Sequence, residues 1–103
     1  MGNSIPREKH LENRIKKHLK SVGAYFIKYW GGGHFTRSGV PDILACVNGK
    51  FIGIEVKSSK GVVSELQKHH LREIERAGGI GMVVRPENYS EFEEVIRETI
   101  QLQ

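Results

Sequence analysis

The chain contains little cysteine and no long apolar segment. Its 103 residues include one cysteine, Cys46, and three prolines. A single cysteine cannot form a disulfide within the chain, which is typical of a reducing compartment, and its place in an apolar stretch predicts a packed thiol. No apolar run approaches the length of a membrane span or a signal-peptide core. We therefore expect a soluble, cytoplasmic protein with no membrane partner.

The composition is basic and fits one domain. Sixteen Lys and Arg residues against twelve Asp and Glu residues give a formal net charge of +4. A positive balance favours an anionic partner such as nucleic acid. The length allows one modest hydrophobic core. We expect a single domain over residues 1–103, with a flexible N-terminus over residues 1–7.

Apolar spacing and chain-breaking residues predict the order α-β-β-β-α-β-α. A strand, helix and strand in succession imply a parallel pairing, so the prediction is an α/β fold with a mixed sheet flanked by helices. The expected elements are a helix over Glu8–Val22, a strand over Ala24–Trp30, a hairpin around Asn48-Gly49, a helix opened by a Ser64–Gln67 capping box, a strand over Ile80–Val84, and a last helix with a capping box at Ser90 and Glu93.

The two later helices each carry an apolar stripe that we expect to be buried. In the second helix the stripe consists of Leu66, Leu71, Ile74 and Ala77. In the last helix it consists of Phe92, Val95, Ile96 and Ile100. This spacing is typical of helices that pack on a sheet.

Two carboxylates and a lysine fall on the predicted hairpin. Asn48-Gly49 predicts a two-residue type I′ turn, because both residues must tolerate positive φ. That turn sets a register in which Asp42 faces Glu55. They form a non-hydrogen-bonded pair, whose Cβ atoms are expected about 4.5 to 5.5 Å apart. Lys57 projects from the same face.

Opposed carboxylates repel each other, and a divalent cation offsets that repulsion. Oxygen ligands suit Mg²⁺ or Mn²⁺, so the pair predicts an open metal site of a nuclease. The alternative is that Asp42 merely opens a strand while Glu55 and Lys57 form a solvated edge. Apolar residues on both faces of the hairpin count against it, because they indicate central strands, where charged ends are costly unless they are used.

Several motifs resemble a known nuclease superfamily. Pro41-Asp42, Glu55-Val56-Lys57 and the following Gln67 resemble the PD-(D/E)xK nucleases. Within that superfamily, four segments in order resemble the stand-alone VRR-NUC domains typical of bacteriophages. These segments are Tyr29–Gly33, Gly39–Asp42, Ser64–Gln67 and Ala77–Gly79. The similarity covers roughly residues 8–96, almost the whole chain.

The resemblance implies a role for each matched position in the hairpin. Asp42 and Glu55 would be metal ligands, and the backbone carbonyl of Val56 would complete the protein's share of the shell. Lys57 would position or activate the attacking water and stabilise charge on the phosphate.

Residues outside the hairpin have weaker signals. Glu12 matches the family's upstream acidic residue, which would hold the metal through water, but by position alone it is an ordinary exposed helix residue. Gln67 would orient Lys57 or a phosphate oxygen, and it already has a structural role as the N3 residue of a capping box. Arg37 and Lys60 flank the site in sequence and are candidate DNA contacts. His34 is a further candidate, although a loop histidine is more often solvated.

The resemblance implies a metal-dependent DNA endonuclease that uses Mg²⁺ or Mn²⁺. Because one site cuts one strand, symmetric cutting of two strands requires two sites, and we expect a homodimer. Stand-alone VRR-NUC proteins resolve four-way (Holliday) junctions, so branched DNA is the expected substrate, in a bacterial host cell if the chain is phage-encoded. Flaps, plain duplex, and a catalytically idle DNA-binding or interaction module remain alternatives. Tyr25, Tyr29 and Trp30 offer base stacking, but aromatic residues in a first strand are more often core.

Overall fold

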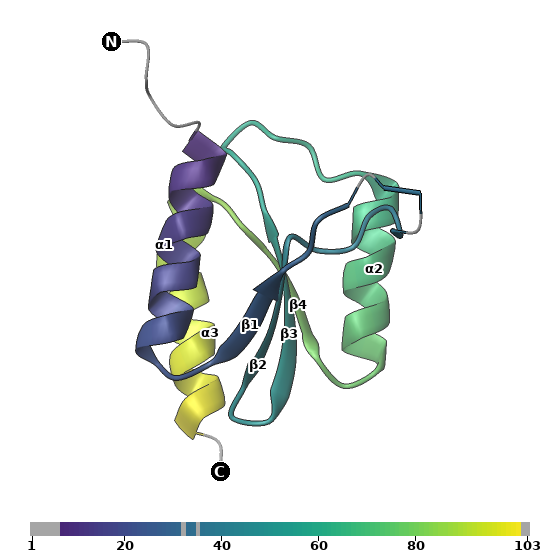
Figure 1. Cartoon of the computed structure of the whole chain (residues 1–103). Helices are drawn as coiled ribbons and strands as arrows, with labels where there is room; N and C mark the ends of the chain where they lie inside the picture. The colour runs from purple at the N-terminus through teal and green to yellow at the C-terminus, as the bar shows by residue number, and fades with distance from the viewer. Residues whose placement is uncertain (1–6, 32, 35, 102–103) are drawn as a thin grey trace, which may run out of the picture.

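The computed structural model describes residues 7–31, 33–34 and 36–101 (Figure 1). The predicted order α-β-β-β-α-β-α and the mixed α/β class are confirmed. Of the predicted flexible N-terminus, residues 1–6 lie outside the described residues, and Arg7 is the first residue of a helix. The elements are α1 (Arg7–Ser21), β1 (Tyr25–Lys28), β2 (Ile43–Val47), β3 (Lys50–Val56), α2 (Glu65–Arg76), β4 (Ile80–Val84), the 3-10 helix η1 (Pro86–Asn88) and α3 (Tyr89–Gln101).

The sheet has the strand order β1-β2-β3-β4, so the predicted hairpin lies at its centre. The predicted register is confirmed, with Ile43 opposite Ile54 and the pairing continuing to the turn. Asn48 and Gly49 have φ values of 51° and 82°, as a type I′ turn requires. β1 and β2 are antiparallel, whereas β3 and β4 are parallel and are joined through α2.

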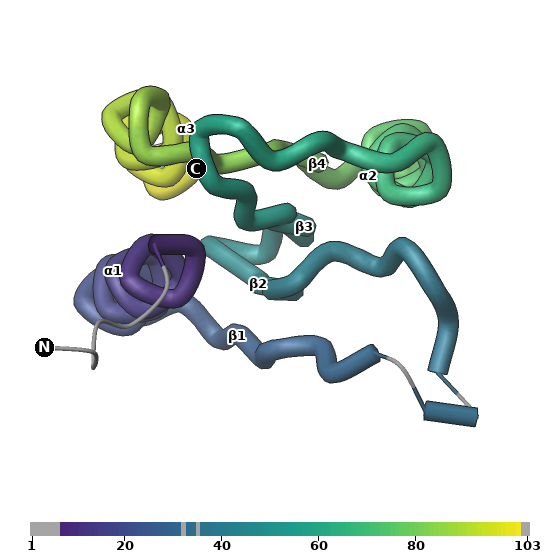
Figure 2. The backbone as a smooth tube through the Cα atoms, turned by 90° about the horizontal axis from the view of Figure 1, so that it is seen from above, coloured from purple at the N-terminus to yellow at the C-terminus, as the bar shows by residue number. Residues whose placement is uncertain are grey.

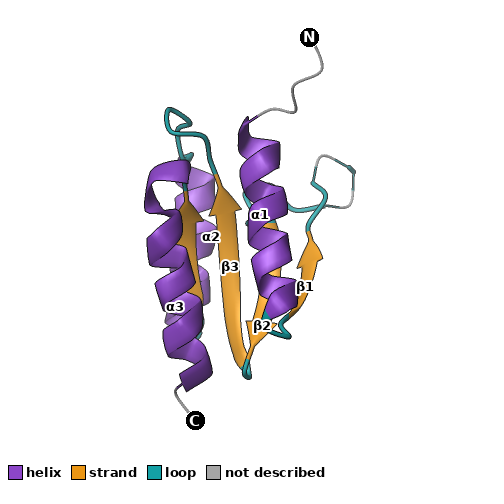
Figure 3. Cartoon of the chain, turned by 90° about the vertical axis from the view of Figure 1, so that its left-hand side faces the viewer, coloured by secondary structure: helices purple, strands orange, loops and turns teal. Residues whose placement is uncertain are grey.

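Helices α1 and α3 cover one face of the sheet, and α2 lies on the other (Figure 2). Figure 3 shows α1 and α3 side by side in front of the strands. Alternate residues of β2 and β3 point between these two helices, which places the main core there. Full burial of each such aliphatic side chain contributes about 1.5 to 3 kcal/mol. The buried set includes Leu11, Ile15 and Leu19 of α1, Ile43, Ala45, Val47, Ile52, Ile54 and Val56 of the hairpin, and Phe92 and Ile96 of α3.

The prediction that α2 buries an apolar stripe is wrong, because no residue of α2 is buried. The strands under α2 present glycines, so the helix lies close to their backbone. A Cβ at Gly81 would come within 2.7 Å of the Leu71 carbonyl oxygen, and one at Gly53 within 2.4 Å of the Ile74 side chain. Contact along such a narrow strip leaves Leu71 and Ile74 half-buried and leaves Leu66 exposed.

The remainder of the α2 face, over β1, β2 and the start of β3, carries exposed apolar side chains. We call Tyr25, Ile27, Cys46 and Phe51 the open face; Tyr25 is 75% exposed and Phe51 is 46% exposed. The prediction that Cys46 is a packed thiol is therefore wrong. Its strand is apolar on both faces, but α2 packs mainly on β3 and β4, so the described part of the chain leaves Cys46 exposed.

The predicted capping box at Ser90 and Glu93 is wrong, because α3 already begins at Tyr89 and places Ser90 inside its first turn. The chain turns before α3, in η1, where the Asn88 side chain accepts a hydrogen bond from the Arg85 amide at 2.6 Å. Phe92 and Ile96 are buried as expected, whereas Ile100 is partly exposed. Within the described residues no helix is long and apolar enough to cross a bilayer.

Candidate active site

Asp42 and Glu55 lie together where β2 begins and β3 ends. The Val56 amide donates a hydrogen bond to Asp42 Oδ2 at 2.8 Å, which fixes the Asp42 side chain against β3. The carboxyl of Glu55 is almost completely enclosed, with 3% of the residue exposed. The hairpin register therefore brings the two carboxylates to one point of the molecule, and leaves Asp42 Oδ1 free of that backbone contact.

The environment of Glu55 opposes its ionisation. Burial and, next, the neighbouring Asp42 raise the pKa of Glu55 to about 8, although the ammonium group of Lys57 acts in the opposite direction. Lys57 Nζ lies 3.8 Å from Glu55 Oε2. The other oxygen, Oε1, is buried and has no hydrogen-bond partner among the described residues. Such an atom is costly unless a proton or a cation completes it.

Gln67 connects Glu55 to the start of α2. Its Oε1 accepts from the Ser64 amide at 2.8 Å, and its backbone N–H donates to Ser64 Oγ at 3.1 Å, so the predicted capping box is confirmed. The amide nitrogen Nε2 donates to Glu55 Oε2 at 2.9 Å. The side chain thus holds Glu55, whereas the resemblance implied that it would orient Lys57 or a phosphate oxygen.

Glu12 is buried, with 6% of the residue exposed, and is not the exposed helix residue that its position alone suggested. Three ammonium groups surround it: Lys28 at 2.8 Å, Lys16 at 3.2 Å and Lys9 at 3.4 Å. Burial opposes ionisation, but the hydrogen bonds from Lys28 and Lys16 outweigh it and lower the pKa of Glu12 below its ordinary value. Glu12 is therefore a carboxylate held by cations of the protein itself.

Lys28 belongs to the site, although the sequence analysis assigned it no role. Its Nζ lies 2.8 Å from Glu12 Oε1 and 3.8 Å from Asp42 Oδ1, so it connects α1 to the hairpin. The available signal was that Lys28 is the only charged residue of an aromatic-rich strand. Among the residues that the structure describes, no group of three His, Cys, Asp or Glu side chains is placed to hold a metal ion.

The candidate DNA contacts His34, Arg37 and Lys60 are exposed. The backbone N–H of Arg37 donates to the Tyr29 hydroxyl at 2.8 Å, which ties the loop back to the end of β1. In the described part of the chain, no hydrogen bond or ion pair joins these three side chains to Asp42 or Glu55.

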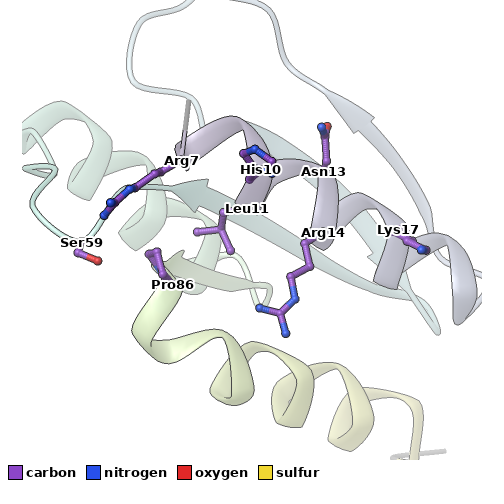
Figure 4. Close-up of a pocket in the computed structure, with 8 residues that line it drawn as sticks. All are labelled: Arg7, His10, Leu11, Asn13, Arg14, Lys17, Ser59 and Pro86. Atoms are coloured by element: carbon purple, nitrogen blue, oxygen red, sulfur yellow. The ribbon is translucent and has the colours of Figure 1, made fainter. Parts of the chain in front are cut away.

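A basic groove of about 600 Å³ runs along α1 (Figure 4). Sequence reasoning did not find it, although basic residues recur along one side of α1. Leu11 and Arg14 point toward Pro86 and α3, and Arg7 points toward Ser59. The described residues that line the groove include no carboxylate; they are Arg7, His10, Leu11, Asn13, Arg14, Lys17, Ser59 and Pro86. Arg85 donates to the carbonyls of Ser58 at 2.8 Å and Gly61 at 2.7 Å, which holds the segment after Lys57 beside this groove.

A four-stranded mixed sheet between helices, with Asp42, Glu55 and Lys57 at the ends of its central hairpin, defines a nuclease-like fold of the PD-(D/E)xK class. A family model described as archaeal Holliday junction resolvase (Hjc) matches residues 4–97. The chain therefore belongs to the Hjc family. No curated protein matches it.

Membership of this family implies an endonuclease that binds branched DNA and cuts Holliday junctions. Nucleases of the superfamily generally use a divalent metal ion. The closer resemblance to phage VRR-NUC domains stays a prediction, because the matching family is Hjc.

Proposed function

We propose that residues 7–101 form one nuclease domain that acts as a homodimer, uses Mg²⁺ or Mn²⁺, and resolves four-way DNA junctions. The observation that supports this most strongly is the buried Glu55 carboxyl beside Asp42, with Oε1 left without a hydrogen-bond partner among the described residues. A carboxyl enclosed in this way destabilises the fold, and groups with strongly shifted pKa values are typical of functional sites. Glu55 lies near the end of the central strand β3, within the residues 4–97 that the family model matches.

The donor set fits a hard divalent cation. Asp42 Oδ1 and Glu55 Oε1 are oxygen donors not used by the Val56 amide or by Gln67, and the Val56 carbonyl follows directly in β3. When bound, such a cation would polarise a non-bridging phosphate oxygen and lower the pKa of a bound water. Because Mg²⁺ usually keeps several waters, two protein carboxylates suffice.

The chain's own residues divide the remaining work. Lys57, held on the face of Glu55, would donate to the attacking water or to the phosphate. Gln67 keeps Glu55 in one orientation through its hydrogen bond. Glu12 acts through Lys28, whose ammonium group it holds beside Asp42. In this scheme Glu12 and Lys28 set the charge around the metal ligands rather than contacting the reacting phosphate.

DNA contacts extend from the site along the basic groove. Arg7 and Lys17 are ten residues apart on α1, which corresponds to about 15 Å. One strand of a duplex presents about four phosphates over that distance. We assign the basic groove to one arm of the DNA. Arg37, Lys60 and His34, which lie in the loops next to the site, would make further DNA contacts.

The open face supports the homodimer. Contiguous exposed apolar side chains mark interaction surfaces, and a two-fold dimer uses the same patch on both subunits. The apolar residues of α3 are less suitable, because Phe92 and Ile96 are buried in the core. Phe51→Glu should convert the dimer to a folded monomer in sedimentation velocity. A dimer that survives this change would locate the interface elsewhere.

Cleavage of three labelled substrates tests the function. Wild type with Mg²⁺ or Mn²⁺ should cut a four-way junction faster than a flap or a plain duplex with the same arm sequences. Asp42→Asn keeps the side-chain shape but lacks the charge, and should abolish cutting while it preserves junction binding in a gel-shift assay. Equal cutting of all three substrates would contradict the junction preference, and full cleavage by Asp42→Asn would contradict the site.

A further inference from the structure

Trp30 is an exposed aromatic side chain next to the candidate active site. It follows β1 by two residues, and 71% of it is exposed. It is the only tryptophan of the chain. Tryptophan is among the most strongly buried residues on average. The expectation that the aromatic residues of this segment are core is wrong for Trp30, and also for Tyr25. An exposed indole beside a cluster of functional groups is a candidate ligand contact.

Two ammonium groups lie beside the indole ring. Lys28 Nζ is 5.4 Å from the ring centroid and Lys9 Nζ is 5.9 Å from it. Cations at this distance are attracted by the face of an aromatic ring. Both lysines also pair with Glu12, and Lys28 continues to Asp42. The ring is thus connected to one proposed metal ligand, Asp42, through the side chain of Lys28.

An exposed ring flanked by cations matches a nucleobase flanked by phosphates. Base stacking on an aromatic side chain tolerates any sequence, because every base has a flat π-face. The ammonium groups would neutralise the adjoining phosphates. In a continuous duplex both faces of each base are already covered by neighbours. Only a base that has left the stack, as at a branch point, has a face available to Trp30.

The other three aromatic residues of the segment, Tyr25, Phe26 and Tyr29, have different roles, and Phe26 packs against the hydrophobic core. The Tyr29 hydroxyl holds the backbone of Arg37, and Tyr25 lies at the far end of β1 opposite Cys46, on the open face. Trp30 is therefore the aromatic side chain of this segment that combines exposure with contact to the lysines of the site.

We propose that Trp30 is a stacking platform for an unstacked base at the branch point, and that this contact makes the protein prefer branched DNA to plain duplex. The proposal rests on the proposed nuclease function and adds to it the residue that senses the branch.

The intrinsic fluorescence of the single tryptophan reports the contact directly. Wild-type protein without divalent metal is titrated with an immobile four-way junction and, separately, with a plain duplex of the same arm sequences. Saturating junction should quench the emission of Trp30, and saturating duplex should leave it nearly unchanged. Equal quenching by both DNAs would overturn the proposal.

Binding by three variants separates stacking from simple apolar contact. Trp30→Ala should weaken junction binding by about 5- to 150-fold, the range that one base–aromatic stack supplies, and should change duplex binding less than about twofold. Trp30→Phe retains a flat ring and should recover most of the junction affinity, whereas Trp30→Leu should resemble Trp30→Ala. Because Trp30 is exposed, all three variants should melt near the wild-type temperature.

The possible failures are distinguishable. If wild type neither binds nor cuts branched DNA, the proposed function itself is wrong. If wild type prefers junctions and Trp30→Ala lowers junction and duplex binding equally, or lowers neither, the nuclease proposal stands and the stacking proposal is overturned. A Trp30→Leu variant with full junction affinity would also overturn it, because leucine cannot stack.

Discussion

The raised pKa of Glu55 predicts that stability falls with increasing pH when no metal is bound. The folded protein keeps Glu55 protonated up to about pH 8, whereas the unfolded chain ionises it near the ordinary value of 4.5. Between these values the folded state binds one proton more than the unfolded state. The contribution is therefore fully present below the lower value and is lost, at about 1.4 kcal/mol per pH unit, as the pH rises toward the higher one.

Metal binding should reverse this loss. A divalent cation binds the ionised carboxylate, so below pH 8 it must displace the proton, and its apparent affinity should rise about tenfold per pH unit. The stabilisation that the bound metal gives the folded state increases with that affinity. Consequently the increase in melting temperature caused by Mg²⁺ or Mn²⁺ should grow from about pH 5 to about pH 8 and then level off. The pKa of Glu12 is lowered from 4.5. The stability that the ionised Glu12 contributes is therefore lost only below pH 4.5, outside this pH range.

Thermal melting of wild type and Glu55→Gln over this pH range, with and without metal, is the assay. The amide introduced by Glu55→Gln cannot ionise and still fills the space beside Gln67, so the variant should lack both the pH slope and most of the metal effect. Glu65→Gln removes the same charge from an exposed side chain of α2 and should retain the wild-type profile. The reasoning would be refuted if the melting temperatures of wild type and Glu55→Gln changed equally with pH. It would also be refuted if metal raised the melting temperature of wild type equally at pH 5 and pH 8.

Three further predictions follow from single contacts. Lys28→Met should lower the cleavage rate about 10- to 100-fold, as loss of a partner around metal ligands typically does, with dimerisation in sedimentation unchanged. Lys17→Gln should reduce the slope of log binding constant against log salt by about 0.9. Lys50→Gln makes the same charge change about 17 Å along β3 from Glu55 and should leave the slope unchanged. Gly81→Ala should destabilise the fold by about 1 to 3 kcal/mol in urea melts, because its Cβ would meet the Leu71 carbonyl.

The hairpin was the most predictable part of the molecule, because its information is local. Asn48-Gly49 defines the turn, and the two-residue period of a strand then carries the register as far as Asp42 and Glu55. The capping box at Ser64 was predictable for the same reason, since all of its contacts lie within four residues.

Contacts between distant segments were not predictable from one sequence. Lys28 and Glu12 are sixteen residues apart, and no sequence motif around either residue predicts that they pair. The exposure of Cys46 depends on how far α2 extends across the sheet, which is set by the glycines under the helix rather than by the strand that contains Cys46. An apolar strand face indicates a surface that can be buried, but does not identify whether a segment of the same chain or another molecule buries it.

The double use of the Gln67 side chain restricts which residues can evolve at this position. Capping boxes commonly accept glutamate in place of glutamine, and after Gln67→Glu the new carboxylate would still accept from the Ser64 amide. It would, however, have no N–H for Glu55 Oε2 and would bring a third carboxyl group beside Asp42 and Glu55. An apolar residue would lose both contacts. The start of α2 and the orientation of Glu55 therefore both depend on the amide of Gln67. A substitution at this position would weaken the helix cap, the contact to Glu55, or both.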